Sequence, residues 1–590
     1  MLQDLISWEL FMSSKFTLDQ KQVAENIKSL QDFMQKEGVE AFYISSSDPF
    51  LNEYVPMENC HRFYLTQFSG SVAEVLFPQK GKVKLYVDGR YHEQADVECD
   101  HDLVDVVKVP SDKSNIACLK EDLASLAPKN IAIEADRTSL AFYEYLNENF
   151  EVKAYLNQEL EEIIDFKKMP PLAKIKHLAR NLRGADTSEK LKRVIKDEQD
   201  AYYITAIDSL AWLTNCRGYH LPNLSSFLGR GFATFDKVYV FIDESVEVEC
   251  SDPCVEFINI NSSHIKEKLN ELKQKYNLSR IFIDKSMLNS QDYLMLKSVF
   301  SEDILVEKKG GLVEYQAIKD STEIKAIKES FKRADKAIFN TLSWVKDQIS
   351  QGHKVSEYDV YEMTSKMYQQ QGALEQSFNT IAGADANGSL IHYSDPKPDL
   401  YLNEQSMVLL DSGGYFESGF ATDTTRTFMA GQSEGSAKQK EIYTLVLKGT
   451  LALQNAVFRP ETKGNALDAV CRQPLFQAGY DFAHGTGHGV GIHVHEGGTG
   501  ISPRTNYPIR AGHVISIEPG IYLPGFGGVR IENIGLVVEH PKYAGFLTFE
   551  PLVYIGFDPL LIEQSLLNQQ EMQWLKEYEA ICKERGTSFY

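Results

Sequence analysis

Long apolar segments and clusters of basic residues are both missing from this sequence of 590 residues. No apolar run approaches the roughly 18 to 20 residues that a membrane-spanning helix needs. Basic residues gather only in short patches such as Lys167-Lys168, and 83 acidic residues outnumber 61 basic ones, which gives a formal charge of −22. The lack of long apolar runs therefore argues against a membrane-spanning protein. The lack of basic clusters argues against a nucleic-acid-binding protein, because contacts to phosphates need clustered Lys and Arg.

Paired cysteine spacings are also scarce. The eight cysteines are scattered, and Cys250 and Cys254 form the one close pair. An isolated pair lacks the other ligands of a structural zinc site and is not a disulfide framework. We therefore expect free thiols in a reducing compartment, with the cytoplasm as the default location. The opening segment from Met1 to Met12 has acidic residues and no basic start, so it is predicted to be neither a signal peptide nor an anchor. Either Met1 or Met12 could be the true first residue.

An internal repeat occurs in the first half of the chain. The whole chain is long enough for about three or four domains. The segment Ala41-Phe-Tyr-Ile-Ser-Ser-Ser-Asp48 is similar to Ala201-Tyr-Tyr-Ile-Thr-Ala-Ile-Asp208. Both follow an amphipathic helical stretch and precede a second strand that ends in Asp, at Asp88 and Asp243. The pattern predicts two α/β domains of related design. Strands that end in Asp are common, so a coincidence of alternating strands is the competing interpretation.

Composition changes along the chain indicate the domain boundaries. The proline pair in Phe166–Pro171 interrupts any helix. After Lys308–Gly311, the stretch Ser321–Gln348 has apolar residues at spacings of three and four, which predicts a long amphipathic helix. Leu561–Lys583 is expected to be helical, as a lid or a dimer contact. We divide the chain into an N-terminal extension, two α/β domains and a third domain with a C-terminal tail, at residues 1–17, 18–165, 166–318 and 319–590.

Five potential metal ligands occur in the last third of the chain, each in or beside a strand-like stretch: Asp411, Asp423, His488, Glu518 and Glu532. Four carboxylates and one neutral imidazole carry enough negative charge to neutralise two divalent cations. Met407–Leu410 and Val514–Ile517 are typical of buried strands that end at two of these carboxylates. A solvated edge strand would explain Glu532 alone, but it does not explain the whole set. The sequence therefore favours a two-metal hydrolase.

Alternation in Val529–Ile534 places Arg530 and Glu532 on one face of a predicted strand and Ile531 on the other. Burial of such a charged pair in an apolar strand is costly unless something such as a metal compensates it.

The glycine-rich segment His484-Gly-Thr-Gly-His488 superficially resembles the histidine pair of zinc proteases. That motif needs a helix and a Glu beside the first His, whereas each glycine here costs a helix roughly 1 kcal/mol. A loop and a short strand are therefore expected, with His488 as a ligand and His484 outside the ligand set. The segment also lacks the glycine spacing of dinucleotide-binding loops and the Gly-Lys-Ser/Thr ending of a P-loop.

The block from Asp411 to Glu532 resembles the metal-dependent aminopeptidases of the pita-bread fold. The whole chain, roughly residues 18–585, is similar to the long, three-domain, cytosolic type of Xaa-Pro aminopeptidase. Further matches occur in the first and second domains, at Ser47–Tyr54, Phe68–Ser71, Asp88–Tyr91 and Ala211–Gly218. The resemblance implies an α/β and α+β multidomain fold, in which two related creatinase/prolidase N-terminal-like α/β domains precede a pita-bread catalytic domain. One departure is that Asp411 and Asp423 are twelve residues apart rather than eleven, which a turn at Gly413–Gly419 can absorb.

The resemblance also implies a role for each candidate. Asp411 would bind one divalent metal, His488 and Glu518 the other, and Asp423 and Glu532 would bridge the two. Manganese is the expected metal, with cobalt or zinc as alternatives. Glu518 would accept the proton of the attacking water. His392, His484 and His495 would contact the substrate or stabilise the transition state, and Arg530 would orient Glu532.

The implied reaction is hydrolysis of the first peptide bond of short peptides with an N-terminal Xaa-Pro, by a cytoplasmic homodimer. One alternative is a related enzyme of the same fold, either a prolidase, which cleaves Xaa-Pro dipeptides, or a methionine aminopeptidase, which two preceding α/β domains disfavour. The other alternative is a non-catalytic peptide-binding member of the fold that has lost its metal ligands. Retention of all five ligands weighs against that second class.

Overall fold

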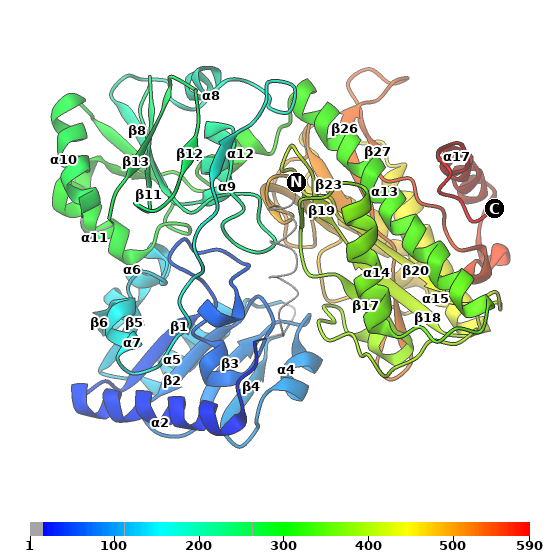
Figure 1. Cartoon of the computed structure of the whole chain (residues 1–590), viewed down its shortest axis with the longest axis horizontal. Coiled ribbons are helices and arrows are strands. Elements are labelled where there is room, and N and C mark those ends of the chain that lie inside the picture. Colours follow the sequence, from blue (N-terminus) through cyan, green and yellow to red (C-terminus); the bar gives the residue numbers. More distant parts are fainter. Residues whose placement is uncertain (1–15, 111, 262–263) are drawn as a thin grey trace.

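The computed structural model describes residues 16–110, 112–261 and 264–590 and arranges them in three domains (Figure 1). Two α/β domains stack on one side of the molecule, and the third domain lies beside both of them. Residues 1–15 of the predicted extension 1–17 lie outside the described residues, and so do both candidate starts, Met1 and Met12. Within the described part of the chain, every helix is too short or too polar to cross a membrane.

The first domain is built on a six-stranded sheet in the order β4-β3-β2-β1-β5-β6. Its strands are β1 (Ala41–Ser45), β2 (Glu74–Pro78), β3 (Val83–Val87), β4 (Val104–Lys108), β5 (Asn130–Glu134) and β6 (Glu151–Tyr155). Its helices are α2 (Gln20–Glu37), α3 (Phe63–Thr66), α4 (His92–Glu98), α5 (Asn115–Leu126), α6 (Leu140–Asn149) and α7 (Asn157–Glu161). The Asp19 side chain caps α2, and Gly38 ends it with a positive φ of 64°, which glycine adopts without a steric penalty.

The second domain repeats this design, with a six-stranded sheet in the order β13-β11-β10-β8-β14-β15. These strands are β8 (Asp200–Ile204), β10 (Arg230–Ala233), β11 (Val238–Ile242), β13 (Val255–Asn259), β14 (Arg280–Ile283) and β15 (Leu305–Glu307). A small sheet adds β7 (Ile175–His177), β9 (Cys216–Arg217) and β12 (Val248–Glu249). The helices are α8 (Thr187–Val194), α9 (Ile207–Thr214), α10 (Ile265–Lys275), α11 (Ser290–Val299) and α12 (Val313–Gln316).

Strand directions establish that the two domains are related. The central strand β1 pairs antiparallel with β2 and parallel with β5, and β8 pairs in the same way with β10 and β14. The outermost strand pairs are parallel in both domains. They are β3–β4 and β5–β6 in the first domain, and β11–β13 and β14–β15 in the second. The internal repeat predicted from the sequence is therefore confirmed.

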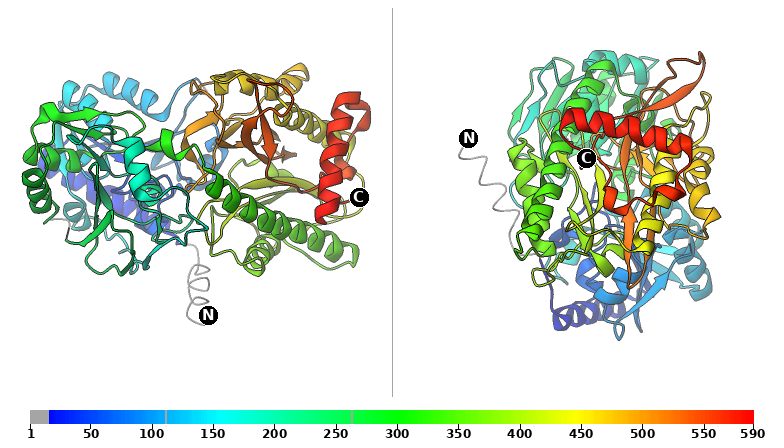
Figure 2. Two further views of the ribbon diagram at one scale, coloured as in Figure 1. Left: turned by 90° about the horizontal axis from the view of Figure 1, so that it is seen from above. Right: turned by 90° about the vertical axis from the view of Figure 1, so that its right-hand side faces the viewer.

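The third domain contains the predicted long helix, α13 (Ser321–Ser350), which begins at a capping box formed by Asp320 and Glu323. Helices α14 (Glu357–Gln370), α15 (Ala437–Gln454), α16 (Gly464–Gln477) and α17 (Gln569–Arg585) follow. Helices α13 and α14 pack against each other and share one apolar core with strands of this domain and with parts of the second domain. Figure 2 shows α17 at the end of the third domain that is farthest from the other two.

The strands of the third domain form several small sheets. A three-stranded sheet contains β17 (Ile381–Ala384), β18 (Met407–Ser412) and β20 (Thr424–Met429), and a five-stranded one contains β21 (Gly487–Gly489), β22 (Glu496–Ile501), β23 (Val514–Ile517), β26 (Asn533–Glu539) and β27 (Leu547–Pro551). Two pairs complete the set: β16 (Glu375–Gln376) with β19 (Gly414–Tyr415), and β24 (Gly520–Leu523) with β25 (Gly527–Arg530).

Two sequence predictions in this domain need correction. The segment predicted to be helical from Leu561 starts with short 3₁₀ turns, and α17 begins only at Gln569, where Asn568 provides the cap. The strand predicted across Arg530 and Glu532 is broken. The backbone N–H groups of Ile531 and Glu532 donate to Pro519 and Thr425 carbonyls, so the chain leaves the β24–β25 pair and enters the larger sheet at β26. All eight cysteines are free, as predicted.

Candidate active site

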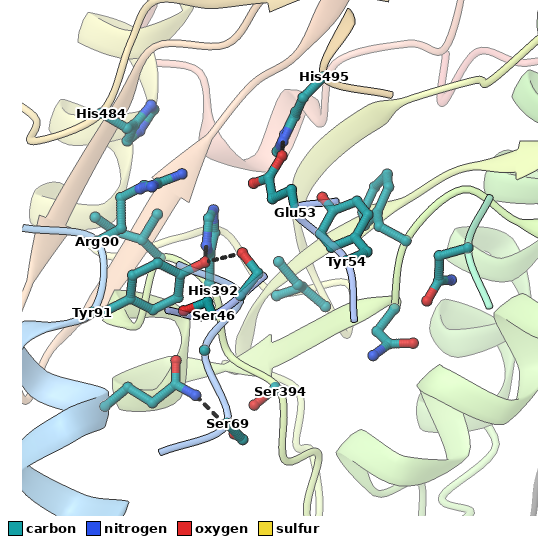
Figure 3. A pocket seen from close by; sticks show the side chains of 18 of the residues that line it. Ser46, Glu53, Tyr54, Ser69, Arg90, Tyr91, His392, Ser394, His484 and His495 are labelled. Atoms are coloured by element: carbon teal, nitrogen blue, oxygen red, sulfur yellow. Dashed lines mark hydrogen bonds and ion pairs between the residues drawn. The ribbon is translucent and has the colours of Figure 1, made fainter. Parts of the chain in front are cut away.

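A cavity of about 1680 Å³ lies where the three domains meet (Figure 3). The third domain contributes all five predicted metal ligands and three of the predicted catalytic groups, His392, His484 and His495, together with Arg530. The first domain contributes a second group of side chains, which includes Glu53, Tyr54, Arg90 and Tyr91. The sequence-predicted site residues are therefore brought together in one place.

The ends and edges of strands deliver the five predicted ligands. Asp411 lies within β18, and Asp423 immediately precedes the neighbouring antiparallel strand β20. His488 lies in β21, Glu518 follows β23, and Glu532 occupies the link between β25 and β26. As predicted, the glycine-rich segment forms a loop and a short strand rather than a helix. Two sheets thus converge on one point of the cavity.

Short distances define the centre of this cluster. His488 Nε2 is 3.4 Å from an oxygen of Asp423 and 3.3 Å from an oxygen of Glu518. Asp423, His488 and Glu532 each offer one ligand atom, and these three atoms lie within 4.8 Å of one another. Carboxylates this close repel each other unless protons or cations reduce the charge. The arrangement brings oxygen and imidazole donors together at a spacing suitable for a shared metal ion.

The electrostatics of the cluster also fit a cationic partner. Burial, followed by neighbouring carboxylates that include Asp411, raises the pKa of Asp423 and of Glu532 well above the usual range. Burial likewise raises the pKa of Glu518. Asp411 Oδ1 and Glu532 Oε1 are buried without a hydrogen-bond partner among the described residues. Since unpaired buried carboxylate oxygens are costly, this donor set fits two divalent cations.

The three further histidines surround the cluster and differ in their partners. His484 Nε2 lies 2.8 Å from the Tyr522 hydroxyl, and its Nδ1 is 4.0 Å from a Glu518 oxygen. Burial, with a smaller effect of Arg530, lowers the pKa of His484 to about 3, and burial also lowers the pKa of His392 and His495. Burial dominates at His392 and His484, so these two imidazoles are neutral near pH 7, whereas at His495 the carboxylate of Glu53 opposes the effect of burial on the pKa.

Arg530 contacts a different carboxylate from the predicted one. Its guanidinium donates to Asp411 Oδ2 at 2.7 Å, to the Tyr522 hydroxyl and to the Thr425 hydroxyl. Glu532 instead accepts a hydrogen bond from Thr425 at 3.0 Å. Arg530 therefore reaches Glu532 through the Thr425 hydroxyl rather than by direct contact, because the strand breaks between them, and its role in orienting Glu532 stays a prediction.

Two residues of the first domain that the sequence reasoning missed contact the predicted histidines. His495 Nδ1 donates to Glu53 Oε2 at 2.9 Å, and His392 Nδ1 lies 2.9 Å from the Tyr91 hydroxyl (Figure 3). Although burial opposes ionisation, the neighbouring His495 keeps the pKa of Glu53 well below its usual range. The loop that carries Glu53 is shaped by Asp48, whose carboxylate accepts hydrogen bonds from the backbone N–H groups of Phe50 and Asn52.

Both missed residues belong to segments already matched by resemblance, Ser47–Tyr54 and Asp88–Tyr91. That match was an available signal, but it carried no information about which residues reach the cavity.

Comparisons with known proteins agree with this geometry. The model of metallopeptidase family M24 matches residues 325–539, and two models of the creatinase/prolidase N-terminal domain match residues 26–165 and 167–323. A probable Xaa-Pro aminopeptidase P of Pyricularia oryzae is 30% identical over 607 residues, which cover 96% of each protein. Aminopeptidase P2 of Arabidopsis thaliana is 30% identical over 621 residues, which cover 95% of this chain and 85% of that protein.

Among solved structures, an X-prolyl aminopeptidase from Caenorhabditis elegans, described as a cytosolic enzyme with a di-nuclear active site, has a TM-score of 0.87 and covers 96% of both chains at 24% identity. That likeness concerns the fold. The predicted architecture, two creatinase/prolidase N-terminal-like domains followed by a pita-bread metallopeptidase domain, is confirmed. Given near-complete coverage at 30% identity, this chain belongs to the Xaa-Pro aminopeptidase P family.

Proposed function

We propose that this chain is a two-metal aminopeptidase that removes the first residue from short peptides with proline in the second position. The observation that carries the proposal is the cluster of four carboxylates and one imidazole in the three-domain cavity, with two buried carboxylate oxygens lacking partners among the described residues. The names of the related proteins support the same activity.

Five side chains would hold the two metals: Asp411, Asp423, His488, Glu518 and Glu532. Two bound divalent cations would neutralise these carboxylates. They would also lower the pKa of a water molecule, so that it could lose a proton near neutral pH and attack a peptide carbonyl. Manganese suits this set because the ligands are oxygens and one imidazole rather than thiolates, with cobalt or zinc as alternatives.

The side chains around the cluster would move protons and bind the reacting groups. Glu518 accepts the proton of the attacking water and passes it to the leaving nitrogen of proline, which carries no hydrogen of its own in the peptide. If the Tyr91 hydroxyl donates to His392 Nδ1, the other ring nitrogen of His392 bears a hydrogen and can donate to the carbonyl oxygen as negative charge develops. His484 lies beside Glu518, where it can contact the substrate.

His495 differs because it already donates through Nδ1 to Glu53. It can donate to substrate from Nε2 only as an imidazolium, a form that the carboxylate of Glu53 stabilises. Arg530 fixes Asp411 through a hydrogen bond of 2.7 Å and so acts as a positioning residue. The homodimer, the cytoplasmic location and the domain boundaries after residues 17, 165 and 318 remain predictions.

Metal analysis combined with two substrates tests the proposal. The purified protein is expected to contain two divalent metals and to cleave Arg-Pro-Pro. Exhaustive chelation should abolish that activity and manganese should restore it best. Cleavage of Gly-Pro but not Arg-Pro-Pro would indicate a prolidase, and peptide binding without cleavage would indicate the non-catalytic class. Undiminished turnover after verified metal loss would refute the two-metal mechanism.

A further inference from the structure

Beyond the reaction itself, we propose that Glu375 forms the far end of the pocket for the first residue's side chain and makes the enzyme prefer peptides that begin with Lys or Arg. This inference rests on the proposed function. It identifies the class of substrate side chain rather than the chemistry of the bond that is cut.

Glu375 lies in β16, which pairs with residues that follow Asp411 in the chain: Gln376 is opposite Gly414 and Glu375 is opposite Tyr415. At the near end of the segment 375–381, Ile381 pairs with Asp411 across β17 and β18. Further along, the Ser377 hydroxyl donates to the carbonyl of Thr422, the residue before Asp423, at 2.7 Å. Glu375 is two residues beyond Ser377, and since an extended chain rises about 3.3 Å per residue, its backbone is on the order of 7 Å farther from the cluster.

The cavity extends along this segment and reaches Glu375. Its lining there includes Tyr361, Phe378 and Gln376 from the third domain, and Asn223 from the second. The Asn223 amide donates to the carbonyl of Gln376 at 3.3 Å, so the second domain closes this side of the cavity. Aromatic rings beside a carboxylate suit the long apolar stem and charged tip of a lysine or arginine.

The carboxylate of Glu375 has no cationic partner among the described residues. The hydrogen bond it accepts comes from the backbone N–H of Gln376, at 2.9 Å. By contrast Glu417, on the neighbouring turn, is paired with Arg333 at 2.6 Å. Glu375 is half-buried on the cavity wall and lacks a counterion, so an incoming cation would gain strong electrostatic stabilisation beside it.

The substrate offers two cations, and their positions distinguish them. The α-amino group is attached to the same Cα as the scissile carbonyl, so it stays within a few ångströms of the metal ligands. An extended Lys or Arg side chain reaches on the order of 6 Å beyond its Cα. A side chain of this length can extend from the reacting centre toward Glu375 whereas the amino group cannot, and so the side chain rather than the amino group is assigned to this carboxylate.

The test compares kcat/KM for Arg-Pro-Pro and Leu-Pro-Pro in the metal-loaded wild type and in Glu375→Gln. The readout is the Arg-to-Leu ratio, which does not depend on the fraction of enzyme that is folded. We expect the wild type to favour Arg and the ratio to fall roughly tenfold in Glu375→Gln, because a charge-assisted contact is lost. Glu375→Lys should lower the ratio further. Glu362→Gln, on the exposed side of α14, is the matched control and should keep the wild-type ratio.

The pH dependence of the ratio gives an independent check. Burial raises the pKa of Glu375 to about 7. The titratable groups that face it are the phenols of Tyr219, Tyr361 and Tyr415, whose pKa values burial raises above their usual range, so they stay neutral near pH 7. Glu375 is charged above pH 7 and neutral below it. The preference for Arg should therefore grow as the pH rises through 7 in the wild type and stay flat in Glu375→Gln.

Three results would overturn the inference. An equal loss on both peptides in Glu375→Gln would indicate a contact with the α-amino group or a structural role, and an unchanged ratio would show that the first side chain does not reach Glu375. Wild-type enzyme that cleaves neither peptide would refute the proposed function and this inference with it.

Discussion

The two α/β domains have the same strand order but contact the third domain in different ways. The first domain inserts side chains into the cavity, where Glu53 meets His495 and Tyr91 meets His392. The second domain lies mainly behind the turn that joins the two aspartate-bearing strands. Its Ser225 hydroxyl donates to the carbonyl of Gly419 at 2.6 Å.

The difference originates in the segment after the first strand of each sheet. After β1 the chain enters a loop turned by Asp48, and this loop extends to Glu53 at the cavity. After β8 the equivalent position, Asp208, lies in the first turn of α9, which keeps the chain close to its own sheet. In the first domain the segment after the first strand is a loop and contacts catalytic histidines. In the second domain the equivalent segment is a helix, and that domain supports the turn between the two aspartates.

The largest expected effect sets the scale for both domains. In Glu518→Gln the amide keeps the shape of the side chain but cannot accept a proton, so kcat for Arg-Pro-Pro should fall by roughly 10²–10⁴-fold. Circular dichroism and metal analysis would verify that the variant is folded and loaded. Wild-type turnover with intact metal content would reassign the general base, and the contributions of the flanking domains would then need a different reference.

A smaller loss is expected from the first domain. Tyr91→Phe removes the hydroxyl that contacts His392, and we expect kcat to fall roughly tenfold while KM changes little, because the imidazole loses its orientation. The pH profile of kcat should also shift, which a purely structural defect would not produce. Tyr145→Phe, at a tyrosine of the first domain that stacks on Phe142, is the matched control. Equal effects of both substitutions would remove the distinction between the domains.

Local patterns were sufficient to predict several elements of this fold. Apolar spacing predicted a helix at Ser321–Gln348, and α13 spans Ser321–Ser350. The repeated strand motif predicted two related domains, since alternation and strand ends are encoded within a few residues. Apolar runs ending in a carboxylate indicated Asp411 and Glu518, the full set of five ligands was predicted with the family resemblance as well, and the structure brings all five into one cavity.

Contacts between domains could not be predicted in this way. Glu53 and His495 are 442 residues apart, and no local periodicity reports that they meet. The single strand predicted to carry Arg530 and Glu532 was wrong because strand alternation assumes an unbroken strand, whereas the chain changes sheets at Ile531 and Glu532. Periodicity identifies which face of an element a residue is on, but not where that element ends or what packs against it.

For the second domain we predict a stability effect with little change in activity. Arg217 donates to the carbonyls of Ala211 and Cys216, and its guanidinium lies 5.6 Å from the ring of Phe420 on the turn between the aspartates. Arg217→Met should lower the free energy of unfolding by about 1–3 kcal/mol, because buried acceptors lose their donor. Urea titration measures this loss. A tenfold fall in kcat/KM of the folded enzyme would place the second domain among the reactive contacts.

The smallest predicted effect concerns one hydrogen bond between the second and third domains. Ser225→Ala removes the donor to Gly419, which has a positive φ of 67° and so holds the turn in a conformation that glycine adopts readily. We expect a loss of about 1 kcal/mol in the free energy of unfolding, since one neutral hydrogen bond contributes about that much. Ser245→Ala, whose hydroxyl donates to the exposed Asp243 two residues away, is the control and should change stability less. If Ser225→Ala instead lowered kcat as strongly as Tyr91→Phe, the turn would transmit strain to Asp411 and Asp423, and support from behind would be as important for turnover as side chains that enter the cavity.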